Sequence, residues 1–594
     1  MTDYGLTFGP APKNRTEKVQ QWLVENEMNA FLMIRTDEFQ GEYLPTYAER
    51  LHYLTGFSGS AGMVIVSKEK SAIFVDGRYS VQIKEELDYD IYTAQHLTDQ
   101  PITQWIENNF TKGDVIAYDP WLFTPSSLNA IKKSSDKVGA VLRETENPID
   151  LIWDEQPSAP VGKVVQHPMS YAGKMHSDKI RIVADALHKN GLDSCIITMS
   201  CSIAWLFNIR GNDVPFNPVM LGYCIVHKDA TAEIYSDLNK FDDEILTHLG
   251  DSVTVKDFTE VTNGFSNLSG NVGADYDFTP LGLINIIKDS DTVVHNFSDI
   301  ARREKAFKNE SEQQGMRDCH IRDGAVMSRM LHWVDTNPIE QQGEWANAQK
   351  LEEFRSQADK FKDLSFDTIS GFGGNGAICH YRVNAQTAMS FTPNNLFLLD
   401  SGTQYEDGTT DITRTMPIGT PSSEHIHNFT LVLKGMIALS RAKFPSAYTA
   451  EQLDCIARAP LFNEGKNFDH GTGHGVGAAL NVHEGPFFFS RRGRGVSFGV
   501  GAIVSNEPGY YVAEEYGIRI ENLMIAQDAG NDWLEWETIT WCPIDRRLID
   551  VELLDKSERQ WLNDYHAETF AKVSPLLQGE DEIIAWLKKM CKAI

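Results

Sequence analysis

The chain has 594 residues, of which 42% are hydrophobic and 23% are charged, and its formal net charge is −29. Single hydrophobic cores stop growing at roughly 250–300 residues, so this length predicts two to four domains of an ordinary soluble protein. The acidic charge excludes a general affinity for nucleic acid, because the phosphates would be repelled.

The N-terminal sequence and the cysteines predict a cytoplasmic protein with no membrane partner. Residues 1–19 lack the apolar core of a secretory signal. The weakly polar stretch 194–209 is broken by polar groups and is shorter than the roughly 18 apolar residues of a membrane span. The eight cysteines are scattered without C-x-x-C spacing, which indicates reduced thiols.

The first half of the chain contains two segments with the same order of patterns. Residues 19–34 and residues 180–198 each have the pattern of an amphipathic helix followed by a buried strand. An aromatic-rich element that ends in glycine and a pair of strands follow in both segments. The shared order predicts a duplicated α/β unit. A stretch with three prolines, 154–168, predicts the linker between the two copies.

Two aspartates flank a predicted strand–turn–strand pattern in the last third of the chain. Asp400 follows the apolar run 396–399, and Asp411 precedes the run 412–418. The segment between them is rich in Glu, Asp and Gly, as turns are. A turn centred near residues 406–407 places both aspartates opposite or diagonal on one face, within roughly 8 Å.

Two glutamates flank a second pattern of this kind. Glu507 ends an apolar strand before Pro508, and Glu521 lies within the predicted strand 518–525. The two glutamates are symmetric in sequence about Glu514, so a hairpin centred there sets them face to face.

The four acids predict a metal site. An acid at the end of a buried strand costs free energy unless it is paired or coordinates a metal. The neighbouring sequence offers no matching basic cluster, so cations are the expected partners of the acids. Sites rich in oxygen ligands suit hard or borderline divalent ions such as manganese.

The segment 468–486 carries three histidines, His470, His474 and His483, among five glycines. It lacks the glutamate of the helical zinc motif H-E-x-x-H, and its glycines disfavour a helix. We therefore expect a glycine-rich loop or strand entry, where the backbone approaches a ligand closely. One histidine is expected to bind metal while the others hydrogen-bond a substrate.

At these residues the chain resembles the aminopeptidase P family of pita-bread metallopeptidases, in particular its long three-domain cytosolic form. The motifs that carry the resemblance lie in all parts of the chain: "YLPTYAERLHYLTGFSGSAG", "FVDGRY", "AWLFNIRGNDVPFNPV", "LDSGTQYEDGTTDITRT", "HGTGHGVGAALNVHEGP", "SNEPGYY" and "GIRIENL". The resemblance implies an α/β and α+β fold. Two related creatinase-N-like α/β domains, 1–155 and 156–305, precede a C-terminal pita-bread catalytic domain with a C-terminal extension, 306–594.

The resemblance also implies the residues of the site. It gives five metal ligands, which are Asp400, Asp411, His474, Glu507 and Glu521. Glu507 is the implied proton shuttle, and the histidines that contact the substrate and assist catalysis are His380, His470 and His483. Arg78, in "DGRY", is expected to reach a substrate bound in a neighbouring subunit.

The activity implied by the resemblance is that of a metal-dependent exopeptidase. It removes the N-terminal residue from peptides with proline in the second position, using a hydroxide held between two metal ions. Two divalent ions per subunit are expected, with manganese favoured over zinc or cobalt, and the enzyme is expected to be a homodimer. One alternative is prolidase, which cleaves only Xaa-Pro dipeptides and shares the metal ligands. A non-catalytic binding protein on the pita-bread scaffold is the other, and the intact ligand set opposes it.

Overall fold

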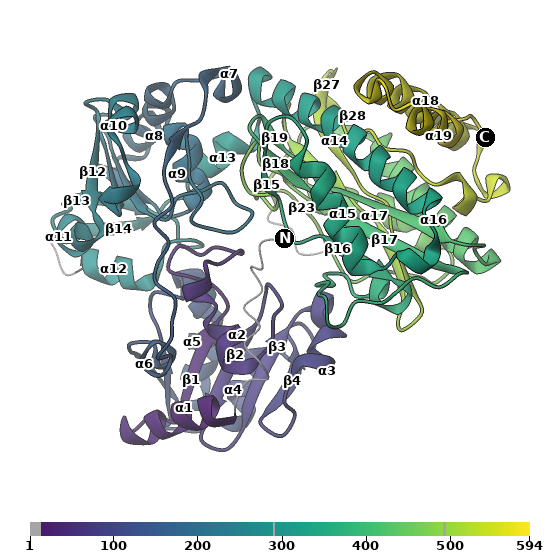
Figure 1. Cartoon of the computed structure of the whole chain (residues 1–594). Helices are drawn as coiled ribbons and strands as arrows, with labels where there is room; N and C mark the ends of the chain where they lie inside the picture. The colour runs from purple at the N-terminus through teal and green to yellow at the C-terminus, as the bar shows by residue number, and fades with distance from the viewer. Residues whose placement is uncertain (1–12, 289–291, 491–494) are drawn as a thin grey trace. The chain divides into compact units, whose positions relative to one another are not determined.

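The chain divides into two compact units (Figure 1). The computed structural model describes residues 13–288, 292–490 and 495–594. The N-terminal unit comprises the chain up to Met169 together with Lys174–Ala301. The C-terminal unit comprises Ser170–Gly173 and Arg302–Ile594. All of the predicted metal ligands therefore belong to the C-terminal unit.

The N-terminal unit contains two six-stranded sheets. In spatial order, the strands of the first are β4 (Tyr92–His96), β3 (Ser71–Val75), β2 (Met63–Ser67), β1 (Ala30–Ile34), β5 (Val115–Tyr118) and β6 (Val141–Glu144). Those of the second are β12 (Val253–Asp257), β11 (Ala232–Ser236), β10 (Tyr223–His227), β8 (Ser194–Ile197), β13 (Gly270–Ala274) and β14 (Thr292–Asn296).

The two sheets have the same topology. The central strand, β1 or β8, pairs antiparallel with β2 or β10 on one side and parallel with β5 or β13 on the other. The outer strands repeat the same sequence of antiparallel and parallel pairs. This agreement confirms the predicted duplication of an α/β unit. The predicted linker 154–168 contains no helix, and its only strand is β7 (Val165–Gln166), which pairs with β9 (Ile209–Arg210).

Helix α5 of the N-terminal unit begins and ends at recognisable capping residues. The Thr124 side chain accepts a hydrogen bond from the Ser127 N–H at the start of α5, and Gly139, with φ 79°, ends that helix. The helices of this unit are α1 (Lys13–Glu25), α2 (Arg50–Thr55), α3 (Gln82–Glu86), α4 (Ile102–Asn109), α5 (Pro125–Val138), α6 (Pro148–Ile152), α8 (His176–Asn190), α9 (Ser200–Phe207), α10 (Asp243–Leu249), α11 (Val261–Ser266) and α12 (Leu281–Lys288). Two further helices, α7 (Met169–Ala172) and α13 (Ile300–Ala306), lie at the unit boundaries.

The C-terminal unit is built from small antiparallel sheets. They are β16 (Ile369–Phe372), β17 (Asn395–Ser401) and β20 (Ile412–Ile418); β15 (Phe361–Leu364), β18 (Thr403–Tyr405) and β19 (Gly408–Thr409); β21 (Lys443–Pro445), β28 (Trp533–Thr538), β27 (Asn522–Gly530) and β24 (Ile503–Asn506); β22 (Gly473–His474) and β23 (Phe488–Phe489); and β25 (Gly509–Val512) and β26 (Tyr516–Arg519).

Helices pack on these sheets around a continuous apolar core. Helix α14 (Glu310–Thr336) is 27 residues long, and Asn309 caps it by accepting from two backbone N–H groups of the first turn. Its Met327 and Met330 share the core with Phe397 and Leu399 of β17 and with Leu587 near the C-terminus. The other helices are α15 (Glu344–Ser356), α16 (Ser423–Ser440), α17 (Ala450–Phe462), α18 (Lys556–Val573) and α19 (Asp581–Met590).

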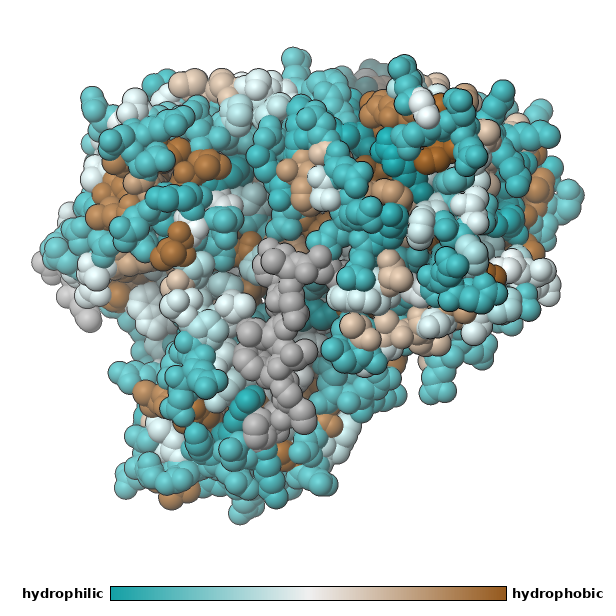
Figure 2. Space-filling model, in the orientation of Figure 1, coloured by the Kyte–Doolittle hydropathy of each residue, from teal (hydrophilic) through white to brown (hydrophobic). Residues whose placement is uncertain are grey.

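The surface is predominantly polar. On the face seen in Figure 2, hydrophilic residues predominate and apolar residues occur as small separate patches, consistent with the net charge of −29. Among the described residues, no helix has the length and apolar character that a membrane crossing requires.

Candidate metal centre

Asp400 and Asp411 meet at the end of one hairpin. Strand β17 pairs antiparallel with β20, with Asp400 opposite Thr413 and Ser401 opposite Ile412. Asp411 immediately precedes β20, so it lies diagonally across from Asp400. Both side chains are buried. The diagonal placement is one of the two arrangements that the sequence predicts.

Glu507 and Glu521 occupy matching positions on the second hairpin. Asn506 of β24 pairs with Asn522 of β27, and Gly509 of β25 pairs with Arg519 of β26. Both pairings are symmetric about Glu514, which has a φ of 64° in the turn. The predicted centre of the hairpin is therefore confirmed.

The prediction of an unbroken strand through Glu521 is wrong. Ile520 and Glu521 fall in a break between β26 and β27. The Glu521 N–H donates to the Thr413 carbonyl at 3.2 Å, and the Glu507 N–H donates to the Thr472 carbonyl at 2.8 Å. The strands separate because these N–H groups bond neighbouring segments. The break thereby ties the glutamate hairpin to the aspartate hairpin and to the histidine segment.

The histidine segment is a glycine-rich loop with a very short strand, as predicted. His474 ends β22, and its N–H donates to the Ser505 hydroxyl at 2.9 Å. A Cβ atom at Gly473 would lie 2.1 Å from the Ser505 carbonyl oxygen, so only glycine allows this approach to β24. The glycine thus brings the His474 ring beside Glu507.

The metal-binding atoms of three predicted ligands lie close together. One donor atom from each of Asp411, His474 and Glu521 lies within 4.8 Å of the other two. The Nε2 atom of His474 lies 3.5 Å from Asp411 Oδ2 and 3.6 Å from Glu507 Oε1. Its Nδ1–H donates to the Gly475 carbonyl at 3.0 Å, which turns Nε2 toward the carboxylates.

Burial and mutual repulsion disfavour full ionisation of these acids. Burial raises the pKa of Asp400, and the Asp411 charge raises it further. Burial raises the pKa of Glu507 to about 7, and burial together with the other three carboxylates raises the pKa of Glu521 well above its ordinary value. Burial lowers the pKa of His474, but Asp411 and Glu507 outweigh it and bring the value to about 9. Such a cluster is stabilised by added positive charge.

Two carboxylate oxygens of the cluster are available to bind a cation. Asp400 Oδ1 and Glu521 Oε1 are buried and have no hydrogen-bond partner among the described residues. Four carboxylates and one imidazole form a donor set that suits borderline divalent ions. The residues present therefore fit two divalent cations.

Arg519 corrects the expectation that the acids have no basic partner. Its Nη2 donates to Asp400 Oδ2 at 2.6 Å, and its Nη1 donates to the Tyr511 hydroxyl at 2.7 Å. Arg519 and Glu521 are two residues apart, a spacing that puts strand side chains on one face. This alternation indicates a basic side chain beside Glu521, but it does not show that Arg519 pairs with Asp400.

The predicted substrate histidines lie at different depths around this cluster. The ring of His483 is perpendicular to that of His474, with centroids 4.4 Å apart. His470 Nδ1–H donates to the Gly471 carbonyl, and its Nε2 accepts from the Tyr511 hydroxyl at 2.8 Å. His380 is half-buried, and the carbonyl of its neighbour Cys379 accepts from Arg519 at 3.3 Å.

Arg78 belongs to the N-terminal unit. It follows β3, and its guanidinium forms an ion pair with Asp76 at 2.8 Å. About a quarter of its side chain is exposed (27%). Its predicted reach to a substrate in a neighbouring subunit stays a prediction.

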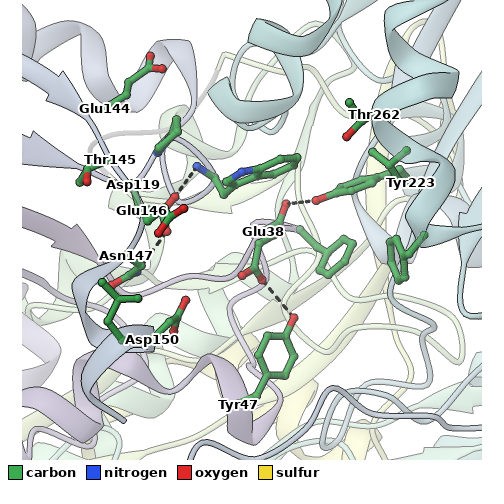
Figure 3. Close-up of a pocket in the computed structure, with 16 residues that line it drawn as sticks. Glu38, Tyr47, Asp119, Glu144, Thr145, Glu146, Asn147, Asp150, Tyr223 and Thr262 are labelled. Carbon is green, nitrogen blue, oxygen red and sulfur yellow. Dashed lines mark hydrogen bonds between the residues drawn. The ribbon is translucent and has the colours of Figure 1, made fainter. Parts of the chain in front are cut away.

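A cavity of about 810 Å³ lies in the N-terminal unit (Figure 3), whereas the predicted ligands belong to the C-terminal unit. The Glu38 carboxylate accepts from the Tyr47 hydroxyl at 3.1 Å, and the Glu38 carbonyl accepts from Tyr223 at 3.2 Å. No residue predicted for the site lines this cavity. The candidate metal site is therefore identified by the convergence of ligand atoms, and not by the presence of a cavity.

Family models match consecutive parts of the chain. Two models of a creatinase/prolidase N-terminal domain match residues 15–150 and 155–312. Metallopeptidase family M24 matches residues 314–528, and the C-terminal region of peptidase M24 matches residues 532–594. These matches define a metallopeptidase with two creatinase-type domains before its catalytic domain, which confirms the predicted fold class.

Whole-chain relatives give the finer grouping. The chain is 37% identical to the probable Xaa-Pro aminopeptidase P of Talaromyces stipitatus, over 97% of this chain and 91% of that protein. It is 36% identical to the protein of that name from Paracoccidioides brasiliensis, over 98% and 99%. The chain therefore belongs to metallopeptidase family M24, in its Xaa-Pro aminopeptidase P group.

Solved structures agree with this grouping. The X-prolyl aminopeptidase of Caenorhabditis elegans, described as a cytosolic enzyme with a di-nuclear active site, is 33% identical to this chain. The two superpose with a TM-score of 0.93, over 98% of this chain and 99% of that one. The prolidase of Pyrococcus horikoshii is 22% identical, with a TM-score of 0.50 over 62% of this chain and 99% of that one, and shows a shared fold alone.

The ion-free protein is expected to lose stability as the pH rises from about 5 to 9. The pKa of Glu507 is about 7 in the folded chain and 4.5 ordinarily. As the pH rises, the unfolded chain therefore releases this proton first, and the free energy of unfolding falls. The stabilising charge of His474 is complete below pH 6.5 and is lost as the pH passes 9. Both effects have the same sign, so the free energy of unfolding falls throughout this pH range.

Thermal unfolding of chelator-treated protein across this pH range measures the slope. Manganese is expected to flatten or reverse it, because ligands must be deprotonated to bind metal. An ion-free protein that grows more stable toward pH 9 would contradict this electrostatic description.

Proposed function

We propose that this chain removes the N-terminal residue from peptides whose second residue is proline. The observation that carries the proposal is the convergence of Asp411, His474 and Glu521 donor atoms within 4.8 Å of one another. The likeness to an X-prolyl aminopeptidase over 98% of the chain supports the choice of substrate.

The residues that would hold two divalent ions are Asp400, Asp411, His474, Glu507 and Glu521. When bound, such ions lower the pKa of a water molecule to near neutrality and polarise the carbonyl of the scissile bond. Manganese is the proposed metal, because four of the five ligands are carboxylates.

Glu507 is the proposed proton shuttle. Its carboxylate is buried beside His474, and burial together with the neighbouring acids raises its pKa to about 7 in the ion-free protein. A carboxylate within hydrogen-bonding distance of the attacking water is the physical requirement for this role. Glu507 accepts a proton from the attacking water and gives it to the proline nitrogen as the C–N bond breaks.

The histidines are proposed to hold the substrate. His380 and His483 orient the scissile carbonyl and stabilise the negative charge that develops on its oxygen, with His470 assisting. The Tyr511 hydroxyl donates to His470 Nε2, which fixes the orientation of that ring. The acidic surroundings suit the free ammonium group of a peptide N-terminus and thereby favour exopeptidase action.

Proline gives a physical reason for a dedicated site. An Xaa-Pro bond is a tertiary amide without an N–H, and the ring fixes φ, so ordinary proteases position it poorly. We propose with it a homodimer, a cytoplasmic location, the bounds of the three domains and the reach of Arg78 into a neighbouring subunit. The description of the C. elegans relative as cytosolic supports the location.

Turnover of an Arg-Pro-Pro peptide by the manganese-loaded protein tests the activity. We expect release of free arginine, with roughly 100-fold or greater loss of kcat/KM when alanine replaces the first proline, about 2.7 kcal/mol of discrimination. Chromatography of the released amino acid measures both. A protein that cleaves the Arg-Pro dipeptide but not Arg-Pro-Pro would be a prolidase. A protein that binds two ions and cleaves neither peptide would be a binding protein.

A further inference from the structure

Glu344 is a fully buried carboxylate that joins both ends of the loop carrying His380. It lies in the first turn of α15 and has no exposed surface. Oε1 accepts from the Phe372 N–H at 2.7 Å, and Oε2 accepts from the Met389 N–H at 2.7 Å. The loop between these two N–H groups contains His380.

Further bonds hold the middle of this loop. The Tyr381 hydroxyl donates to Glu344 Oε2 at 2.9 Å, and the Asn375 amide donates to both carboxylate oxygens at 3.1 Å. The Glu344 N–H also donates to the Met389 carbonyl at 3.0 Å. All these donors to the carboxylate are neutral. One side chain thus fixes four points of a loop that has little regular structure of its own.

The residues on either side of His380 are held from opposite directions. The Cys379 carbonyl accepts from Arg519, which also binds Asp400. Tyr381 is held by Glu344. The backbone of His380 is therefore fixed between a residue that contacts a proposed metal ligand and a residue that lies on a separate helix.

We infer that Glu344 is a positioning residue that sets the place of His380 in the active site. It acts through the loop and does not itself touch the substrate. The inference rests on the proposed role of His380 in holding the peptide. His483 lies on another segment, the glycine-rich one, with its ring beside that of His474.

Glu344→Gln tests the inference, because it preserves size but cannot preserve the bonds. An amide nitrogen in place of Oε1 would face the Phe372 N–H, and in place of Oε2 it would face the Met389 N–H. Either orientation leaves a buried backbone donor unpaired. We expect kcat/KM for Arg-Pro-Pro to fall roughly 10- to 100-fold, as when an orienting partner is lost, with two manganese ions still bound.

The double variant Glu344→Gln/His380→Ala distinguishes positioning from general damage. It is expected to match His380→Ala alone in kcat/KM, within about two-fold, because a residue that acts through His380 has nothing left to position. The split between kcat and KM in Glu344→Gln should resemble that in His380→Ala. Tyr381→Phe, which removes a single donor and spares the backbone bonds, is expected to give a smaller loss of the same kind.

Asp213→Asn is the matched control. Asp213 is also buried and accepts from two backbone N–H groups and from Lys240, but it lies in the N-terminal unit. We expect it to lower the melting temperature while leaving kcat/KM per folded molecule unchanged. Additive losses in the double variant, or loss of manganese from Glu344→Gln, would overturn the assignment of Glu344. Full activity of His380→Ala would overturn the proposed role of His380 itself.

Discussion

Glu521→Gln is expected to lose both bound ions and to lower kcat/KM by at least about 10³-fold, because several kcal/mol of transition-state stabilisation depend on the ions. Glu521 Oε1 is buried without a hydrogen-bond partner, whereas Oε2 accepts from the Thr413 hydroxyl at 2.8 Å. Glutamine retains the size of the side chain and can retain the bond to Thr413, but it removes the charge that would bind the ions. Metal analysis by mass spectrometry and peptide turnover measure the two losses.

The same substitution is expected to stabilise the ion-free protein. Burial and three neighbouring carboxylates raise the pKa of Glu521, so its ionised form costs free energy in the absence of metal. At pH 8 the melting temperature of ion-free Glu521→Gln should therefore exceed that of the ion-free parent. A substitution that stabilises the ion-free protein but abolishes its activity indicates that the replaced residue serves function and not stability.

Glu537→Gln is the control for this pair of effects. Glu537 lies on β28 of the same unit and pairs with Arg317, away from the cluster. It is expected to change neither the number of ions nor the turnover. If Glu521→Gln bound two ions and kept full turnover, the assignment of Glu521 as a metal ligand would be wrong.

Removal of the ions by a chelator is expected to abolish turnover, and manganese is expected to restore it best. The reason is the donor set, in which four carboxylates accompany the single imidazole of His474. Activity after dialysis against manganese, zinc or cobalt gives the ranking. Restoration by zinc alone would refute the choice of metal, and turnover that persists without any ion would refute the metal-dependent chemistry.

The sequence was sufficient to predict how the acids meet. Asp400 and Asp411 end and begin apolar runs on either side of a polar turn, and Glu507 and Glu521 are symmetric about Glu514. In a hairpin, turn position determines which residues face each other, so these local features predict cross-strand neighbours. The repeated helix–strand order likewise predicted two sheets of one topology, because the connections within each copy are short.

The features that the sequence did not reveal depend on contacts between distant segments. The break at Ile520 and Glu521 arises because the Glu521 N–H bonds Thr413, more than a hundred residues earlier. Periodicity alone reads this stretch as one strand. The Arg519–Asp400 pair and the network around Glu344 also join segments whose pairing no local pattern encodes.

The choice among the three histidines marks another limit of local patterns. Spacing and glycine content indicated a ligand in the segment, and only the family resemblance singled out His474. In the structure, the Nδ1–H of His474 bonds the Gly475 carbonyl and leaves Nε2 facing Asp411 and Glu507. A backbone bond of this kind, which selects a tautomer, follows from the fold and not from composition.

The central claim is that two divalent cations neutralise the cluster of buried acids. Anomalous diffraction at the manganese absorption edge, from crystals of the manganese-loaded protein, tests it most directly. Two peaks are expected, both among the side chains of Asp400, Asp411, His474, Glu507 and Glu521. A well-ordered cluster without such peaks, or with the ions bound by other residues, would contradict it.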